Sequence, residues 1–387
     1  MRNTVLVIAV ALVALVAGIF LGGHPDTLPG PVRDTFVQED RALRSQIVQT
    51  IEHNYYKPVD KSKLDDAALK GIVESLGDPY SHYLTPTEAK ALHEQISGEF
   101  DGVGMSVEKD QRGLRVLNVF NGSPAQKAGI REQDLIVSVD GRSIAGISSD
   151  LATGRIKGPA GTSVSLEVFT PGAQDTRTVR VKRERITVPV ATGRLVEHDG
   201  RKLGVVRLTT FTSGAHAAVR ARVKKLLDQG AEGIVLDLRG NGGGLLDEAV
   251  LVSSLFIEDG KIVSVRGLHR SEETHDAEGQ AIDPRGPMVV LVDEGSASAS
   301  EIVTGALRDR HRATVVGTNT FGKGLVQEVE PLSNGGYLDL TVANYYLPGG
   351  KTISTSGLKP QVRAFDKPRT KRDEALPVAL NVLAGKL

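Results

Sequence analysis

The stretch Met288-Val-Val-Leu-Val-Asp-Glu-Gly-Ser-Ala-Ser-Ala-Ser-Glu-Ile-Val-Thr-Gly-Ala-Leu307 decides how this chain folds. It begins with five consecutive apolar residues, which is typical of a strand buried on both faces. After Glu301 the pattern becomes that of a helix. A strand that passes through a short turn into a helix is one unit of an α/β core. The turn carries three serines, Ser296, Ser298 and Ser300.

Three more apolar runs and two helical patterns surround this stretch. Since strands buried on both faces alternate with helices, we predict an α/β core over about residues 186–360. The predicted strands are Leu203–Leu208, Gly233–Leu238 and Thr314–Val316, and the predicted helices are His216–Leu227 and Leu245–Phe256.

The rest of the chain divides into regions with different residue patterns. Residues 34–97 show helical periodicity, broken by Asp78-Pro-Tyr-Ser81. Residues 98–185 read as a compact β-rich module, because short alternating strands are separated by glycine turns. Residues 361–387 form a tail with a predicted helix over 373–383. We found no internal repeat.

The N-terminus, residues 1–23, predicts export. Arg2 precedes an uncharged apolar run from Thr4 to Leu21, long enough at ~1.5 Å per residue to cross most of a ~30 Å hydrocarbon layer. A cleaved signal peptide has a shorter apolar region and a small-x-small site after it. We therefore favour an uncleaved signal anchor over a signal peptide. Either places the body outside the cytoplasm, in the periplasm or at the cell surface.

Composition excludes several classes of protein. The chain has 47 basic and 47 acidic residues and no basic stripe, so nucleic acid is not an expected partner. It has no cysteine, which excludes disulfides, thiolate nucleophiles and cysteine-bound zinc. The sequence also lacks His-Glu-x-x-His, and we expect neither a metal nor a cofactor.

Ser298 and Lys323 are the candidate nucleophile and base. A serine hydroxyl needs a positioned base to react at neutral pH. Lys323 lies in a glycine-flanked loop after the strand Thr314–Val316, and a dry pocket would lower its affinity for a proton from the usual pKa of ~10.4. A plainer interpretation is that Ser298 and Glu301 form a capping box at the helix start.

Other catalytic patterns fit less well. The run Gly317–Lys323 matches a phosphate-binding Walker loop, but Gly324 stands where a magnesium-binding Ser or Thr is needed. Ser356 and Lys359 have Ser-x-x-Lys spacing but lie in a loop that Pro360 follows. His311 and Asp309 could complete a triad, although a solvated helix terminus suits them better.

Two glycine-rich segments are candidate binding loops. Gly240-Asn-Gly-Gly-Gly244 lies between a strand and a helix, so its backbone amides favour a phosphate or a developing oxyanion. Its spacing excludes the dinucleotide fingerprint, because position 245 is leucine. In the β-rich module, Gly98–Ser106 and Gly122–Ile130 look like a PDZ domain, with Val103, Gly104 and Met105 as the loop that binds a peptide carboxylate. A plain hairpin turn is the alternative.

These motifs together resemble the C-terminal processing, or tail-specific, serine proteases that carry a PDZ domain. The matching residues are Asp78–Ser81, the PDZ elements, Asp237–Gly244, Gly295–Glu301 and Phe321–Gln327. The resemblance implies a ClpP/crotonase-like β-β-α core with an inserted PDZ domain. It also implies an endopeptidase that binds the C-terminus of polypeptide substrates.

The resemblance implies roles for individual residues. Ser298 would be the nucleophile, and Lys323, twenty-five residues later, the base that Gln327 orients. The oxyanion hole would combine the amides of Ala299 and a glycine, Gly244 or Gly243. Similar enzymes assemble through their N-terminal helices, so the resemblance implies a homodimer. An adaptor protein is a further candidate partner. The competing function is a catalytically inactive PDZ scaffold or chaperone.

Overall fold

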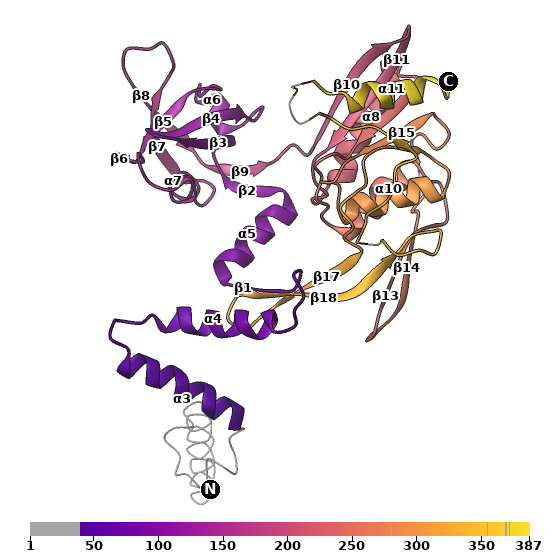
Figure 1. Cartoon of the computed structure of the whole chain (residues 1–387). Helices are drawn as coiled ribbons and strands as arrows, with labels where there is room; N and C mark the ends of the chain where they lie inside the picture. The colour runs from indigo at the N-terminus through magenta and orange to yellow at the C-terminus, as the bar shows by residue number, and fades with distance from the viewer. Residues whose placement is uncertain (1–38, 280, 354, 368–369, 371) are drawn as a thin grey trace, which may run out of the picture. The chain divides into compact units, whose positions relative to one another are not determined.

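The computed structural model describes residues 39–387 apart from 280, 354, 368–369 and 371 (Figure 1). The predicted signal anchor at residues 1–23 therefore lies outside the described residues. Within the part of the chain that the structure describes, no helix combines the length and the apolar character needed to cross a membrane. The chain divides into two compact units, residues 1–85 and 86–387.

The described part of the first unit, residues 39–85, is mainly helical. It contains helices α3 (Glu39–Asn54) and α4 (Lys61–Glu74) and the short strand β1 (His82–Leu84). Asp60 caps α4 by accepting a hydrogen bond from the backbone N–H of Ser62 at 3.0 Å. The Asp78-Pro-Tyr-Ser81 motif forms a turn in which Asp78 accepts from the Ser81 hydroxyl at 2.6 Å.

The second unit begins with α5 (Pro86–Ser97) and then a β-rich region. Strands β2 (Glu99–Gly102) and β9 (Glu184–Thr187) pair with each other antiparallel. Between them lies an antiparallel sheet in the order β3-β4-β5-β7-β8, with β6 on β5 and the helices α6 and α7. The bounds are β3 Met105–Asp110, β4 Gly113–Val119, β5 Leu135–Val139, β6 Arg142–Ser143, β7 Ser163–Phe169, β8 Arg177–Lys182, α6 Pro124–Lys127 and α7 Ser149–Ile156.

The remaining residues form an α/β core around one sheet in the order β10-β11-β12-β15-β16-β19. The pair β10/β11 is antiparallel and the others are parallel. Each predicted apolar run is a strand. The bounds are β10 Ala191–His198, β11 Arg201–Leu208, β12 Gly233–Asp237, β15 Met288–Val292, β16 Thr314–Gly317 and β19 Val362–Arg363.

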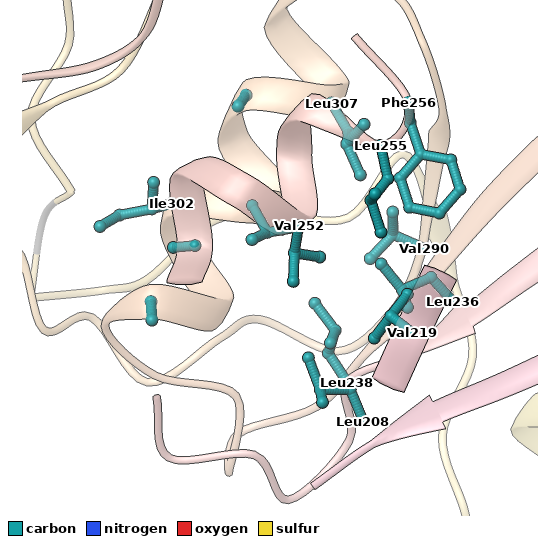
Figure 2. Close-up of a cluster of buried hydrophobic side chains, with 14 of the residues drawn as sticks. Leu208, Val219, Leu236, Leu238, Val252, Leu255, Phe256, Val290, Ile302 and Leu307 are labelled. Atoms are coloured by element: carbon teal, nitrogen blue, oxygen red, sulfur yellow. The ribbon is translucent and has the colours of Figure 1, made fainter. Parts of the chain in front are cut away.

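Helices bury both faces of this sheet. Because side chains alternate along a strand, Leu236 and Val290 join a core with α8 (Ala215–Asp228), α9 (Leu246–Ser254) and α10 (Ala299–Asp309) (Figure 2). Val235 and Val289 face the other way, against the C-terminal helix α11 (Ala375–Ala384). Double coverage explains why these strands read as unbroken apolar runs.

A second, antiparallel group of strands comes from the segments before and after α10. Strand β13 (Lys261–Gly267) pairs with β14 (Arg270–Asp276) and β18 (Tyr337–Tyr346), and β18 also pairs with β17 (Leu325–Pro331). Strand β17 begins two residues after Lys323. A Walker loop leads into a helix, whereas β17 is a strand. The structure therefore does not support the Walker interpretation.

Candidate active site

The turn between β15 and α10 presents one of its three serines and buries the other two. Ser296 and Ser300 are fully buried, and their hydroxyls donate to the carbonyl oxygens of Leu238 at 2.9 Å and Asn241 at 2.8 Å. Ser298 is partly exposed. Its φ of 53° is unusual for a residue with a side chain and is typical of a sharp strand-to-helix turn that presents a nucleophile.

The glycine-rich loop lies directly against this serine. A Cβ on Gly243 would lie 2.9 Å from the Ser298 Cβ and 3.1 Å from the Ala299 nitrogen, so no larger residue fits. A Cβ on Gly244 would instead meet the carbonyl oxygen of Phe211 at 2.4 Å. The two glycines that the sequence nominates are therefore not equivalent, since Gly243 contacts the serine turn and Gly244 contacts Phe211.

Asn241 holds the glycine loop in this position, a role that sequence reasoning missed. Its side chain is buried, donates to the Leu208 carbonyl at 3.0 Å and accepts from the Gly243 N–H at 2.9 Å. Its own carbonyl oxygen accepts from the Ala297 N–H at 3.0 Å. The sign of this role in the sequence is that a single asparagine interrupts a run of glycines.

Glu301 connects the serine turn to the lysine loop. Its carboxylate is fully buried and accepts from the Ser298 and Lys323 backbone N–H groups through the same oxygen, each at 2.9 Å. Its other oxygen accepts from the Thr320 hydroxyl at 2.5 Å and the Gly322 N–H at 2.8 Å. The backbones of Ser298 and Lys323 thus lie within two hydrogen-bond lengths of each other.

The capping box was therefore only part of the role of Glu301. The bond from its carboxylate to the Ser298 N–H is the predicted Glu301 half of the box. The other three bonds reach residues nineteen or more positions away. Local sequence spacing gives no sign of them.

The backbone after Lys323 packs tightly against neighbouring segments of the chain. A Cβ on Gly324 would lie 2.3 Å from the Ile353 carbonyl oxygen, so glycine is required. The Gly324 carbonyl oxygen accepts from the Tyr345 N–H at 2.9 Å. Burial raises the pKa of the Tyr345 phenol to about 12, so this neighbour of the lysine loop stays neutral.

Gln327, Asp309 and His311 lie outside the serine turn and the glycine-rich loop. Gln327 lies on β17, where its side-chain amide donates to the Thr341 hydroxyl at 3.3 Å. Asp309 accepts hydrogen bonds from Arg308 and from the Gly349 N–H, and His311 is exposed just beyond α10. The exposure of His311 fits the solvated helix terminus that the sequence suggests, whereas the Asp309 side chain is only 15% exposed and pairs with Arg308.

The proposed carboxylate loop of the PDZ region is tightly folded. Val103 is buried, and its carbonyl oxygen accepts from the Ala125 N–H at 2.8 Å. Gly104 has a φ of 81°, and a Cβ there would lie 2.4 Å from the Ser123 Cβ. Met105 begins β3. The loop therefore depends on glycine for both its conformation and its packing.

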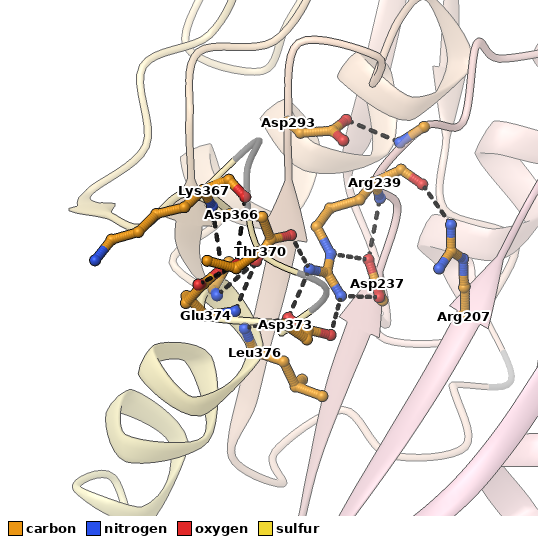
Figure 3. Close-up of polar contacts among 12 residues, drawn as sticks. Arg207, Asp237, Arg239, Asp293, Asp366, Lys367, Thr370, Asp373, Glu374 and Leu376 are labelled. Carbon is orange, nitrogen blue, oxygen red and sulfur yellow. Dashed lines mark hydrogen bonds and ion pairs between the residues drawn. The ribbon is translucent and has the colours of Figure 1, made fainter.

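Arg239, immediately before the glycine loop, is the centre of a cluster of aspartates (Figure 3). Burial lowers the pKa of its guanidinium, but hydrogen bonds to Asp237 and Asp373 raise it further than burial lowers it. Burial also raises the pKa of Asp373, but bonds from Arg239 and the Leu376 N–H leave that pKa lower than usual. Arg239 and Asp373 are therefore both charged at neutral pH.

Comparison with known proteins agrees with this architecture. Residues 202–364 match peptidase family S41, residues 91–169 the PDZ domain, and residues 37–87 the N-terminal domain of the activating protease CtpB. The carboxy-terminal processing protease CtpA of Bacillus subtilis (strain 168) is 36% identical over 360 residues, covering 93% of this chain and 76% of that protein.

The solved structures that resemble the chain include the following two. The photosystem II D1 C-terminal processing protease has a TM-score of 0.51 at 32% identity, over 85% of this chain and 94% of that one. A Bacteroides fragilis protein assigned to the S41 proteases has a TM-score of 0.53 at 17% identity, over 88% and 97%, which supports the fold alone.

Fold and comparisons define a serine-type peptidase with a PDZ domain. The chain belongs to the C-terminal processing proteases of peptidase family S41. This confirms the family, the fold class and the enzyme class that the motifs predict.

Proposed function

We propose that this protein is an extracytoplasmic endopeptidase that uses Ser298 as nucleophile and Lys323 as general base. The observation that carries the proposal is the buried Glu301 carboxylate, because one oxygen binds the backbone N–H of both residues. A shared anchor fixes the spacing between nucleophile and base, and such positioning supplies much of the rate in covalent catalysis.

The reaction follows from these roles. The Ser298 Oγ attacks the scissile carbonyl carbon while neutral Lys323 accepts the hydroxyl proton. The C–N bond then breaks, the protonated lysine returns that proton to the leaving amine, and an acyl-enzyme remains. Water attacks the acyl carbon with Lys323 again as base, which releases the new carboxylate and regenerates Ser298.

The oxyanion hole would use two backbone amides. The Ala299 N–H, at the first turn of α10, is aided by the partial positive charge of the helix N-terminus. The second donor is Gly244 or Gly243. Contact with the serine turn favours Gly243, although its N–H bonds to Asn241 in this structure. Gln327 would orient the Lys323 amine.

The PDZ region, which we place at residues 98–185, would bind the C-terminal residues of the substrate. Val103, Gly104 and Met105 would hold the terminal carboxylate, while the edge of β3 pairs with the peptide backbone. The tight loop around Gly104 supports a preformed carboxylate site. An adaptor or the substrate itself would then present the chain to the protease core.

Recognition of the terminal carboxylate predicts a difference between paired substrates. An unfolded polypeptide with a free C-terminus should be cleaved at least about tenfold faster at low concentration than the same polypeptide with an amidated C-terminus, because the amide lacks the charge. The ratio should come from KM, measured by initial rates. Equal rates for both substrates would refute recognition through the carboxylate.

The N-terminal unit supports a homodimer. Its exposed apolar side chains, each more than half accessible, are Leu43, Ile47, Tyr55, Tyr56, Ile72 and Leu76. Surfaces of this kind in soluble proteins mark association sites. The match of residues 37–87 to the CtpB N-terminal domain agrees with a dedicated module here. The signal anchor would attach the assembly to the membrane.

We expect the double substitution Ile47→Asp and Ile72→Asp to convert the dimer into a monomer. Burying two charges in an apolar interface costs several kcal/mol, so the dissociation constant should rise by at least about a hundredfold. Light scattering coupled to gel filtration measures the mass. Leu268→Asp, at an exposed apolar residue of the second unit, is the control and should leave the mass unchanged. A wild-type monomer would contradict the proposal.

A further inference from the structure

The guanidinium of Arg239 is a fork between the protease sheet and the C-terminal helix. One edge faces back to β12, where Nε and Nη2 donate to the two carboxylate oxygens of Asp237 at 2.9 and 2.8 Å. The Arg239 side chain is only 11% exposed and that of Asp237 only 4%. Such a bidentate pair fixes the orientation of the guanidinium as well as its position.

The other edge of the guanidinium binds two aspartates from the far end of the chain. Nη1 donates to Asp366 and to Asp373, each at 2.9 Å, and Nη2 donates to Asp373 at 3.0 Å (Figure 3). These aspartates follow Arg239 by 127 and 134 residues. We call Arg239, Asp237, Asp366 and Asp373 the Arg239 cluster.

The two distal aspartates also organise the start of α11. Asp366 accepts from the backbone N–H groups of Glu374 at 2.8 Å and Ala375 at 3.0 Å. Asp373 accepts from the Leu376 N–H at 2.9 Å. These are the unpaired donors of a helix N-terminus, so the position of α11 and the position of the Arg239 fork are set together.

On its other side, the peptide after Arg239 joins the serine turn. The Gly240 N–H donates to Asp293 at 2.8 Å, and the Gly295 N–H donates to the same oxygen at 3.0 Å. A Cβ on Gly295 would lie 2.9 Å from the Gly240 Cα. The first residue of the glycine loop is therefore packed between the Arg239 fork and the turn that carries Ser298.

We propose that Arg239 is a positioning residue for catalysis. In this proposal α11, which binds Arg239 through Asp366 and Asp373, helps to hold the glycine loop in its catalytic position. The proposal rests on the proposed function, in which that loop supplies an oxyanion donor. Without Asp366 and Asp373, the Arg239 guanidinium keeps Asp237 as its one carboxylate partner. The glycine loop then loses its hydrogen-bonded connection to α11. An oxyanion donor displaced by about 1 Å can cost up to about a hundredfold in rate.

The test uses the full chain with Asp366→Asn and Asp373→Asn combined. Asparagine keeps the size and one acceptor oxygen, and both aspartates are partly exposed, so the fold should persist. We expect kcat on unfolded casein to fall by about tenfold to a hundredfold with KM within about twofold of wild type. Arg239→Lys, which keeps the charge but not the fork, should show the same split.

Glu232→Gln is the matched control. Glu232 pairs with Arg201 at 3.2 Å, is exposed to the same extent as Asp373, and lies at the opposite end of β12 from Arg239. Its kcat should equal that of wild type. Melting temperatures by circular dichroism, with kinetics well below them, separate positioning from stability, since a purely structural cluster would lower the melting temperature and leave kcat unchanged.

The outcomes distinguish this proposal from the proposed function. If wild type cleaves casein, Ser298→Ala does not, and the double variant keeps the wild-type kcat, the Arg239 proposal is overturned and the catalytic mechanism stands. If Ser298→Ala cleaves casein like wild type, the proposed mechanism fails, and this proposal fails with it.

Discussion

Ser298→Ala and Lys323→Ala should each reduce kcat/KM by at least ~10³-fold, because removing either member of a nucleophile–base pair removes covalent catalysis. Such pairs act as a unit, so the double variant should be no slower than either single one. Initial rates on an unfolded polypeptide give the comparison. Binding of a C-terminal peptide, followed by fluorescence anisotropy, should not change in any of the three.

The neighbouring serines provide the control for this prediction. Ser300→Ala removes the bond from a buried hydroxyl to the Asn241 carbonyl. It should lower the free energy of unfolding by about 1 kcal/mol and leave most of the activity. Substantial cleavage by Ser298→Ala or by Lys323→Ala would eliminate the dyad, and cleavage by both would point to a different nucleophile.

Glu301→Gln should have the second-largest effect, on activity and stability together. The carboxylate accepts four hydrogen bonds, and an amide must turn an N–H₂ group toward donors at one of its two positions. Losing charge-assisted bonds in a buried site costs roughly 1.5–3 kcal/mol each. We expect kcat/KM to fall by about a hundredfold, as the Lys323 loop shifts relative to Ser298.

The control for this substitution lies in the same turn. Glu294 is exposed, and Glu294→Gln should change neither the rate nor the melting temperature. Initial rates and thermal unfolding followed by circular dichroism measure both effects. If Glu301→Gln unfolds at a lower temperature but keeps the wild-type kcat/KM below that temperature, Glu301 stabilises the fold without positioning the dyad.

Much of the secondary structure was predictable from short patterns. The run Met288–Val292 is strand β15, and the predicted helix 216–227 differs from α8 by one residue at each end. These elements are buried on well-defined faces, so their periodicity reports their environment directly. The short strand β1 was missed inside the region read as helical. It has only three residues, too few for alternation to stand out.

Local periodicity and motifs that are continuous in the chain were enough to predict the α/β class and the family and to nominate Ser298 and Lys323. They could not show that Ser296 and Ser300 are buried while Ser298 is partly exposed. Nor could they show that Gly243 contacts the serine turn, that Glu301 joins the backbones of Ser298 and Lys323, or that Arg239 joins β12 to the start of α11. A hydrogen bond between residues far apart in the chain depends on how the strands and helices pack, and spacing along the chain carries no record of that packing.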